Sequence, residues 1–335
     1  MSASFLKSNV LSYFNKKEAT MKTLQFKNGD TMHSLGLGTW KSKGNDVKNA
    51  VKEALYAGYR HIDTAAAYDN EEFIGEALAE VFAEGRIFRE DVFITSKLWN
   101  DSHGEGQVIP ALQTSLKKLQ LDYLDLYLMH WPIAFKLGVS FPSSPSDYVS
   151  LEEEPLSMTW KQLEQAKDAG YAKHIGVSNF SKKKLQALIK DASIIPEMNQ
   201  VELHPLLQQK DLLDFCSSED ILMTAYSPLG SGDRSEGMKG DDEPNLLEIE
   251  TLQKIARKRD ATVAQVLISW HMHRGTAVIP KSTTKEHIVA NFRAADVKLD
   301  KEDMDSIAEL DKHYRFITGK FFDAPEKGYT NVYDE

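Results

Sequence analysis

Apolar residues along the chain follow two periods in turn, and this alternation predicts a regular series of strands and helices. Short apolar runs of strand length lie at residues 35–38, 61–64, 92–97, 124–129, 172–177, 196–201, 222–226 and 278–280. Segments with helical spacing follow them at 45–57, 71–83, 106–119, 156–169, 182–189, 210–217, 262–274 and 285–291. Eight strand–helix units in one chain predict an α/β fold of the (β/α)8, or TIM-barrel, type.

The other fold that such alternation allows is a doubly wound sheet with a glycine-rich turn after its first strand. Gly36-Leu-Gly38 is followed here by Thr39, Trp40 and Lys41, without the third glycine of that motif. The sequence therefore favours the barrel.

Several segments fall outside the repeat. Asn28-Gly29 lies between two short β-like runs, 23–26 and 31–35, and predicts an N-terminal β-hairpin. Two extra helices are expected at 245–259 and 301–310, and two long loops at 132–155 and 231–244. Loops of this length in a compact domain usually bind substrate or cover a site. The aromatic-rich tail after residue 310 either covers a pocket or docks against the barrel.

Composition adds limits to the function. The chain has 335 residues, 50 acidic and 40 basic, with a net charge of −10, which argues against a nucleic-acid partner.

We expect one barrel domain at 21–335, after an N-terminal extension at 1–20. A single cysteine, Cys216, excludes an internal disulfide and favours a cytoplasmic setting. No apolar run reaches membrane-spanning length. No dimer surface stands out, so we expect a monomer or weak oligomer.

Four polar residues end or follow strands that are neighbours in the predicted barrel. They are Asp63 and Tyr68 after the second strand, Lys97 at the end of the third and His130 at the end of the fourth. Catalytic groups of such barrels lie at the carboxyl ends of the strands. Taken singly, each residue has an ordinary structural explanation, but together they predict a convergent site.

Six ordered motifs then resemble the aldo-keto reductase family over residues 22–335. They are Gly58-Tyr-Arg-His-Ile-Asp-Thr-Ala65, Leu128-Met-His-Trp-Pro132, Gly176-Val-Ser-Asn-Phe180, Asn199-Gln-Val-Glu-Leu-His-Pro205, Ala225-Tyr-Ser-Pro-Leu-Gly230 and Ile279-Pro-Lys-Ser282. The resemblance implies NADPH-dependent reduction of aldehydes or ketones, sugars among them, to alcohols. It also assigns Tyr68 as proton donor, Lys97 and Asp63 as the pair that adjusts it, and His130 as the group that orients the carbonyl oxygen.

The resemblance further implies a cofactor site. The nicotinamide carboxamide would contact Ser178, Asn179 and Gln200, and its ring would stack on Tyr226. The residues expected at the pyrophosphate are Ser227, Leu229, Ser231 and Asp233. Those expected at the adenosine and its 2′-phosphate are Lys281, Ser282, Thr283, His287 and Asn291.

His287 stands where the family usually has an arginine. A histidine is largely neutral at pH 7 and offers fewer hydrogen-bond donors than an arginine. The 2′-phosphate would therefore lose a permanently charged, bidentate partner. NADPH is therefore expected as the preferred cofactor, with NADH also possible.

Trp40, Trp99 and Trp131 follow strands and are expected to wall the substrate pocket, which suits apolar or aromatic carbonyl compounds. No residue spacing predicts a metal site. A second function class stays open, because a barrel of this kind can also bind the cofactor as a non-catalytic sensor or regulatory subunit. The sequence does not name a substrate.

Overall fold

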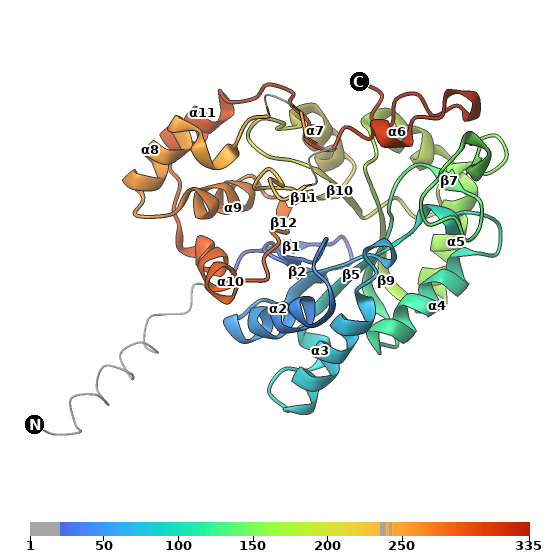
Figure 1. Cartoon of the computed structure of the whole chain (residues 1–335), viewed down its shortest axis with the longest axis horizontal. Helices are drawn as coiled ribbons and strands as arrows, with labels where there is room; N and C mark the ends of the chain where they lie inside the picture. The colour runs from blue at the N-terminus through green and yellow to red at the C-terminus, as the bar shows by residue number, and fades with distance from the viewer. Residues whose placement is uncertain (1–20, 235–238, 241–242) are drawn as a thin grey trace, which may run out of the picture.

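Eight parallel strands curl around a common axis and helices surround them (Figure 1). The computed structural model describes residues 21–234, 239–240 and 243–335, so the predicted extension at 1–20 lies outside it. The barrel strands are β3 (Leu37–Gly38), β4 (His61–Asp63), β5 (Phe93–Leu98), β6 (Leu124–Met129), β9 (Ala172–Ser178), β10 (Met198–Glu202), β11 (Leu222–Tyr226) and β12 (Ala277–Val278). Their order is β12-β11-β10-β9-β6-β5-β4-β3, which confirms the predicted (β/α)8 fold.

The barrel closes at a seam between its first and last strands. Parallel bridges join Leu35 to Val278 and Gly38 to Lys281. The backbones approach so closely that a Cβ on Gly38 would lie 2.6 Å from the carbonyl oxygen of Ile279. Glycine at position 38 therefore permits closure, and β12 ends before Pro280, which has no N–H to continue the ladder.

Eight helices pack around the strands, one after each. They are α2 (Gly44–Ala57), α3 (Glu71–Ala83), α4 (Val108–Leu119), α5 (Leu156–Asp168), α6 (Lys182–Asp191), α7 (Lys210–Ser218), α9 (Val263–His273) and α10 (Lys285–Phe292). The two extra helices are α8 (Glu250–Lys258) and α11 (Lys301–Ala308), each shorter than predicted. The strands form because apolar runs buried on both faces suit a parallel sheet, and all six residues of β5 and of β6 are buried.

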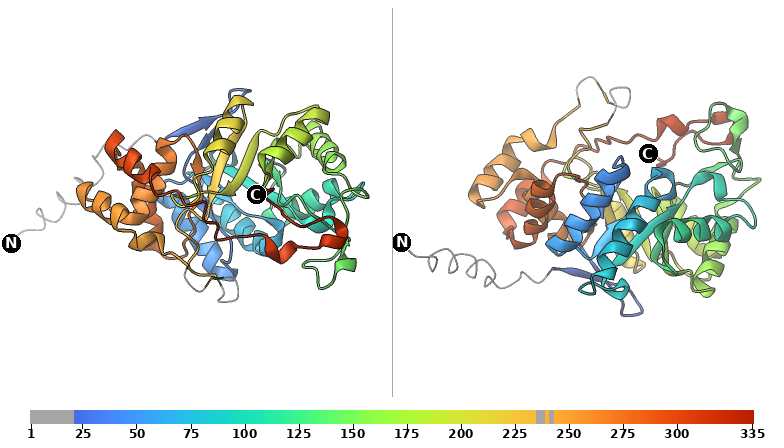
Figure 2. Two further views of the ribbon diagram at one scale, coloured as in Figure 1. Left: turned by 90° about the horizontal axis from the view of Figure 1, so that it is seen from above. Right: turned by 60° about the horizontal axis from the view of Figure 1, so that its bottom comes forward.

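The predicted N-terminal hairpin, β1 (Thr23–Gln25) with β2 (Thr31–His33), closes the amino-terminal end of the barrel. Phe26 and Met32 pack against apolar side chains inside the barrel, including Leu126 and Met198. Both views in Figure 2 place this hairpin and the C-terminal tail on opposite sides of the molecule. The other end of the barrel is therefore left for the site.

The loop at 132–155 contains a feature that its polar sequence did not reveal. Strands β7 (Ala134–Phe135) and β8 (Tyr148–Val149) pair as a small antiparallel hairpin. Phe135 and Tyr148 pack in one cluster with tail residues such as Phe322 and Tyr329. The tail thus docks on this loop, and it also lines the cavity described below.

A buried carboxylate fixes the start of the tail. Glu202, at the end of β10, accepts hydrogen bonds from the backbone N–H groups of Phe316 (2.6 Å) and Ile317 (2.8 Å). His204 lies 2.9 Å from the same carboxylate, and the side chains of Glu202 and His204 are fully buried. The last residues are held separately, because Asp334 accepts hydrogen bonds from Ser181 and Lys184 on or next to α6.

Candidate active site

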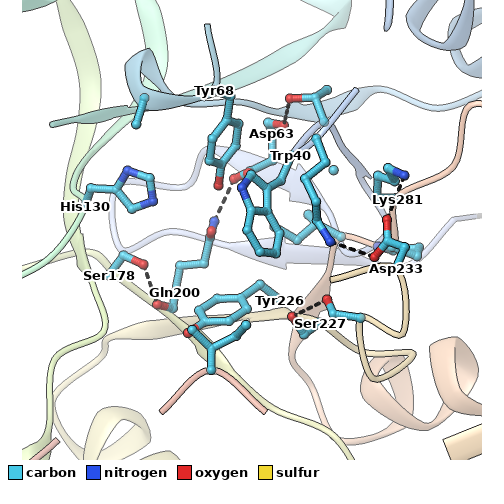
Figure 3. Close-up of a pocket in the computed structure, with 18 of the residues that line it drawn as sticks. Trp40, Asp63, Tyr68, His130, Ser178, Gln200, Tyr226, Ser227, Asp233 and Lys281 are labelled. Atoms are coloured by element: carbon cyan, nitrogen blue, oxygen red, sulfur yellow. Dashed lines mark hydrogen bonds and ion pairs between the residues drawn. The ribbon is translucent and has the colours of Figure 1, made fainter. Parts of the chain in front are cut away.

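A cavity of about 1240 Å³ opens at the carboxyl ends of the strands, where the sequence placed the chemistry. Figure 3 shows residues from several strands that point into it. Trp40, Trp99 and Trp131 line it, as predicted, and the tail adds Ile317, Phe321 and Phe322. Phe141, from the loop at 132–155, completes this wall. The sequence had indicated an aromatic tail and a long loop without singling out these four residues.

Lys97 is buried behind the cavity lining, where it contacts Asp63 and Tyr68. Its ammonium donates to the Asp63 carboxylate (2.5 Å), to the carbonyl oxygen of Thr64 (2.8 Å) and to the Tyr68 hydroxyl (3.4 Å). Gln200 donates to the other Asp63 oxygen at 2.6 Å. Burial is the largest single influence and would lower the pKa of Lys97, but Asp63 and Tyr68 together outweigh it and hold that pKa above its ordinary value. Lys97 is therefore a permanent cation beside the tyrosine.

Tyr68 keeps its proton at neutral pH. Burial raises the pKa of its hydroxyl, and the Lys97 ammonium opposes part of that rise. The net direction of the pKa of Tyr68 is upward because burial is the larger effect. A neutral phenol next to a fixed cation is a proton donor whose anion would be stabilised as it forms.

His130 faces Tyr68 across the cavity (Figure 3), with 5.7 Å between the ring centroids. Burial and the Lys97 charge lower the pKa of His130 well below its usual value, so the imidazole is neutral. Its Nδ1 atom is buried without a hydrogen-bond partner among the described residues. Trp99 packs edge-on against the ring at 5.1 Å and helps to fix its orientation. A neutral, oriented imidazole can donate one hydrogen bond to a substrate oxygen.

The expected nicotinamide contacts form one network on β9, β10 and β11. Tyr226 donates to the Asn179 side-chain oxygen at 2.7 Å, and the Asn179 amide donates to the His130 carbonyl oxygen at 3.0 Å. Ser178 donates to the Gln200 carbonyl oxygen at 2.7 Å. Asn179 has the left-handed backbone conformation (φ 64°), which asparagine tolerates. A hydrogen bond thus links Asn179, in the predicted carboxamide site, to the backbone of His130.

The opposite side of the cavity carries the cations. Asp233 accepts from Lys281 at 3.0 Å and from Lys41 at 2.7 Å, and the two lysines lower the pKa of Asp233 to about 2. Ser227 and Ser231 are hydrogen-bonded to each other at 2.8 Å. Asp233 therefore ties the loop after β11 to the ends of β3 and β12. Sequence reasoning missed Lys41, although it follows the first strand more closely than Tyr68 follows the second.

The remaining predicted cofactor residues divide into two groups. Leu229, Ser282, Thr283 and His287 line the cavity. Asn291 lies one turn beyond His287 on α10, is 7% exposed and is not among the lining residues. All the predicted site residues except Lys97 and Asn291 line this one cavity, and Lys97 lies directly behind its lining, in contact with Asp63 and Tyr68.

In the described part of the chain, no group of three or more His, Cys, Asp or Glu side chains is placed to hold a metal ion. No helix in that part of the chain is long and apolar enough to cross a membrane. Cys216 lies buried in α7, and burial raises the pKa of its thiol to about 12. It is therefore not a reactive thiolate at neutral pH.

Fold and site together define a barrel protein with a Tyr, Lys, Asp and His site beside an aromatic wall. The model of the aldo/keto reductase family matches residues 34–312. An aldo/keto reductase of Synechocystis sp. is 48% identical over 318 residues, which cover 94% of this chain and 97% of that protein. Aldo-keto reductase family 1 member A1 is 44% identical in Gallus gallus (292 residues; 87% of this chain and 89% of that protein). The Sus scrofa protein of the same name is also 44% identical (291 residues; 86% and 89%).

The chain belongs to the aldo/keto reductase family. It is accordingly an oxidoreductase that acts on aldehydes and ketones, in a family that generally binds a nicotinamide cofactor.

Proposed function

We propose that this protein reduces aldehydes or ketones, sugars included, to alcohols with NADPH as preferred cofactor and Tyr68 as proton donor. The observation that carries the proposal is the placement of the Tyr68 hydroxyl at the cavity, 3.4 Å from the Lys97 ammonium and across from the neutral His130. A proton donor, a cation that stabilises its anion and a hydrogen-bond donor then surround one substrate oxygen.

In this mechanism a bound reduced nicotinamide supplies the hydride to the carbonyl carbon. His130 donates a hydrogen bond to the carbonyl oxygen and orients it. Tyr68 transfers its phenolic proton to that oxygen as negative charge develops there, so the products are an alcohol and a tyrosinate. Lys97 stabilises the tyrosinate, Asp63 holds Lys97 in place, and a proton from solvent restores Tyr68.

The residues of the cavity fit such a cofactor. Lys41, Lys281 and His287 gather at one side, where they suit the phosphates, and the Tyr226 ring lines the cavity near Asn179 and Gln200, where it suits a flat ring. We propose that Lys281, Ser282 and Thr283 hold a 2′-phosphate and favour NADPH. His287 in place of a permanent cation weakens that preference and permits NADH.

The cofactor proposal is tested with His287→Arg. A guanidinium that pairs with the 2′-phosphate should tighten NADPH binding about tenfold and leave NADH binding within about twofold. Dissociation constants follow from quenching of protein fluorescence. An equal effect on both cofactors would remove His287 from the phosphate site.

The catalytic proposal is tested with Tyr68→Phe, which removes only the hydroxyl. We expect kcat to fall about 10²- to 10⁴-fold with NADPH and an aromatic aldehyde, while the NADPH dissociation constant changes less than about threefold. Tyr56→Phe, an exposed tyrosine on α2, is the matched control. Wild-type turnover by Tyr68→Phe would refute the proton-donor assignment. Cofactor binding without turnover of any carbonyl compound by the wild type would favour the sensor alternative.

We also propose that the protein works as a cytoplasmic monomer or weak oligomer. The single cysteine of the chain is consistent with a reducing compartment. Light scattering over a range of protein concentrations tests the oligomeric state.

A further inference from the structure

The lysines that line the cavity lie together, around Asp233. They are Lys41 and Lys281, which follow β3 and β12 on either side of the barrel seam. Figure 3 shows Lys281 with Asp233 on one side of the cavity and His130 on the other. Among the described lining residues, no lysine or arginine belongs to the segments after β4, β5 and β6.

The part of the cavity lined by the segments after β4, β5 and β6, here called the substrate side, carries the carboxylates of Asp69 and Asp101. Asp69 follows Tyr68 directly, and Asp101 lies two residues after Trp99 in the turn beyond β5. Neither forms an ion pair with any described residue. Within the part of the chain that the structure describes, the Asp101 side chain accepts one hydrogen bond, from the hydroxyl of its neighbour Ser102 at 3.0 Å. Asp69 is exposed, whereas Asp101 is half-buried.

The apolar surroundings of Asp101 reduce the screening of its charge. Trp99 leads into this turn, and its ring packs against His130 at 5.1 Å and Phe322 at 6.3 Å. Phe141 extends the aromatic wall, with its ring 5.6 Å from that of Phe322. An uncompensated charge beside apolar side chains acts over a longer distance than one in open solvent, because less polarisable material screens it.

We propose that Asp101, with a smaller contribution from Asp69, selects substrates by charge. The substrate side would accept neutral or positively charged aromatic and apolar carbonyl compounds, and disfavour those that carry a carboxylate. This inference rests on the proposed function, because it names the substrate class of the same site. Asp101 is a specificity-determining residue in this scheme, and Asp69 contributes less because solvent and salt screen an exposed charge.

The opposing interpretation is that Asp101 only accepts a local hydrogen bond from Ser102 and that its charge is fully solvated. The two interpretations differ in what happens when the charge alone is removed. Asp101→Asn keeps the shape of the side chain and an oxygen acceptor. Asp69→Asn is equally conservative, because asparagine tolerates the left-handed backbone that Asp69 adopts (φ 52°).

The experiment uses three aldehydes of similar shape and different charge with NADPH at pH 7. They are 4-carboxybenzaldehyde, its neutral amide 4-formylbenzamide, and the cationic 4-(trimethylammonio)benzaldehyde. For the wild type we expect kcat/KM for the amide to exceed that for the carboxylate about tenfold, with the cation at least equal to the amide. The ratio should shrink when ionic strength is raised from about 0.05 M to about 0.5 M.

In Asp101→Asn the ratio of amide to carboxylate should fall about fivefold, and in Asp69→Asn about twofold. Asp122→Asn is the matched control, since Asp122 is an exposed carboxylate between α4 and β6, at the opposite end of the barrel. It should leave the ratio at the wild-type value.

A wild-type ratio near one, or a ratio that Asp101→Asn does not change, overturns the charge proposal while the reductase proposal stands. If no aldehyde is reduced with NADPH or NADH, the reductase proposal is wrong. The charge proposal is then decided by the dissociation constants of the carboxylate and the amide, measured by quenching of tryptophan fluorescence. Tighter binding of the amide that Asp101→Asn abolishes supports it, and equal binding overturns it.

Discussion

Replacing Asp63 by asparagine removes the counter-charge of a buried lysine. The side chains of Lys97 and Asp63 are 0% and 2% exposed, and 2.5 Å separates the charged atoms. The introduced asparagine would still offer one oxygen to Lys97, but its amide would face the Gln200 amide, which now donates to Asp63 at 2.6 Å. The Gln200 amide would have to flip or lose its hydrogen-bond partner. The substitution would therefore also affect the expected nicotinamide contacts, to which Gln200 belongs.

The size of the effect follows from burial. Breaking a buried ion pair by removing one partner costs about 3–5 kcal/mol, because the other charge stays buried without compensation. Since the introduced asparagine keeps one hydrogen bond to Lys97, we expect a loss of about 3 kcal/mol in the free energy of unfolding, the lower end of that range. Burial would then dominate and lower the pKa of Lys97, so the tyrosinate formed by Tyr68 would lose its stabilising cation. We expect kcat to fall at least about 100-fold.

Urea unfolding of Asp63→Asn, Lys97→Met and the double variant measures the coupling between the two residues. The double variant contains no buried unpaired charge at this pair, so it should be more stable than the sum of the single losses predicts, by about 2 kcal/mol. Asp214→Asn is the control, because it breaks the exposed Lys210–Asp214 pair and should cost less than about 0.5 kcal/mol. Additive losses, or an Asp63→Asn protein within about 1 kcal/mol of wild type, would refute the reasoning.

Two further predictions concern stability and the tail. Burial lowers the pKa of His61 and of His103 to about 3, so between pH 6.5 and 3 the unfolded chain binds protons that the folded chain does not. As pH falls below 6.5, each histidine should therefore reduce the free energy of unfolding by about 1.4 kcal/mol per pH unit, which is the contribution of one bound proton. His103→Gln should remove one such contribution from the measured pH dependence. Glu202→Gln would set an amide against the N–H groups of Phe316 and Ile317, and hydrogen exchange should show faster exchange of the tail with the barrel strands unchanged. Unchanged exchange would mean that the aromatic cluster alone holds the tail.

The sequence predicted the barrel well because each of its strands is specified by a few neighbouring residues in the chain. A strand such as β11 is a short apolar run between polar turns, and its predicted bounds, 222–226, are those observed. The clustering of the candidate catalytic residues was predictable too, since Asp63, Lys97 and His130 lie at the ends of strands that are neighbours in any barrel of this order. Parallel strands bring their carboxyl ends together whatever the rest of the chain does.

What the sequence could not predict depends on contacts between distant segments. The pairing of Lys41 with Asp233 joins residues 192 positions apart. The β7–β8 hairpin forms where a polar loop meets aromatic tail residues, and neither segment alone has strand periodicity. Asp101 was not singled out, because nothing in its local sequence shows that it lines the cavity without an ion pair to any described residue. The net rise in the pKa of Tyr68 depends on burial, which no motif reports.

The seam of the barrel has a consequence for folding. Gly38 and Lys281 meet there although they lie at opposite ends of the repeat in the chain, so closure requires those two ends to find each other. Such long-range pairing is slow to form and costs chain entropy. Lys41 and Lys281 stand on opposite sides of this seam, and an anion bound between them would hold the first and last strands together. A phosphate-bearing ligand would then stabilise the closed barrel. The protection of the seam against opening would rise with the ligand concentration.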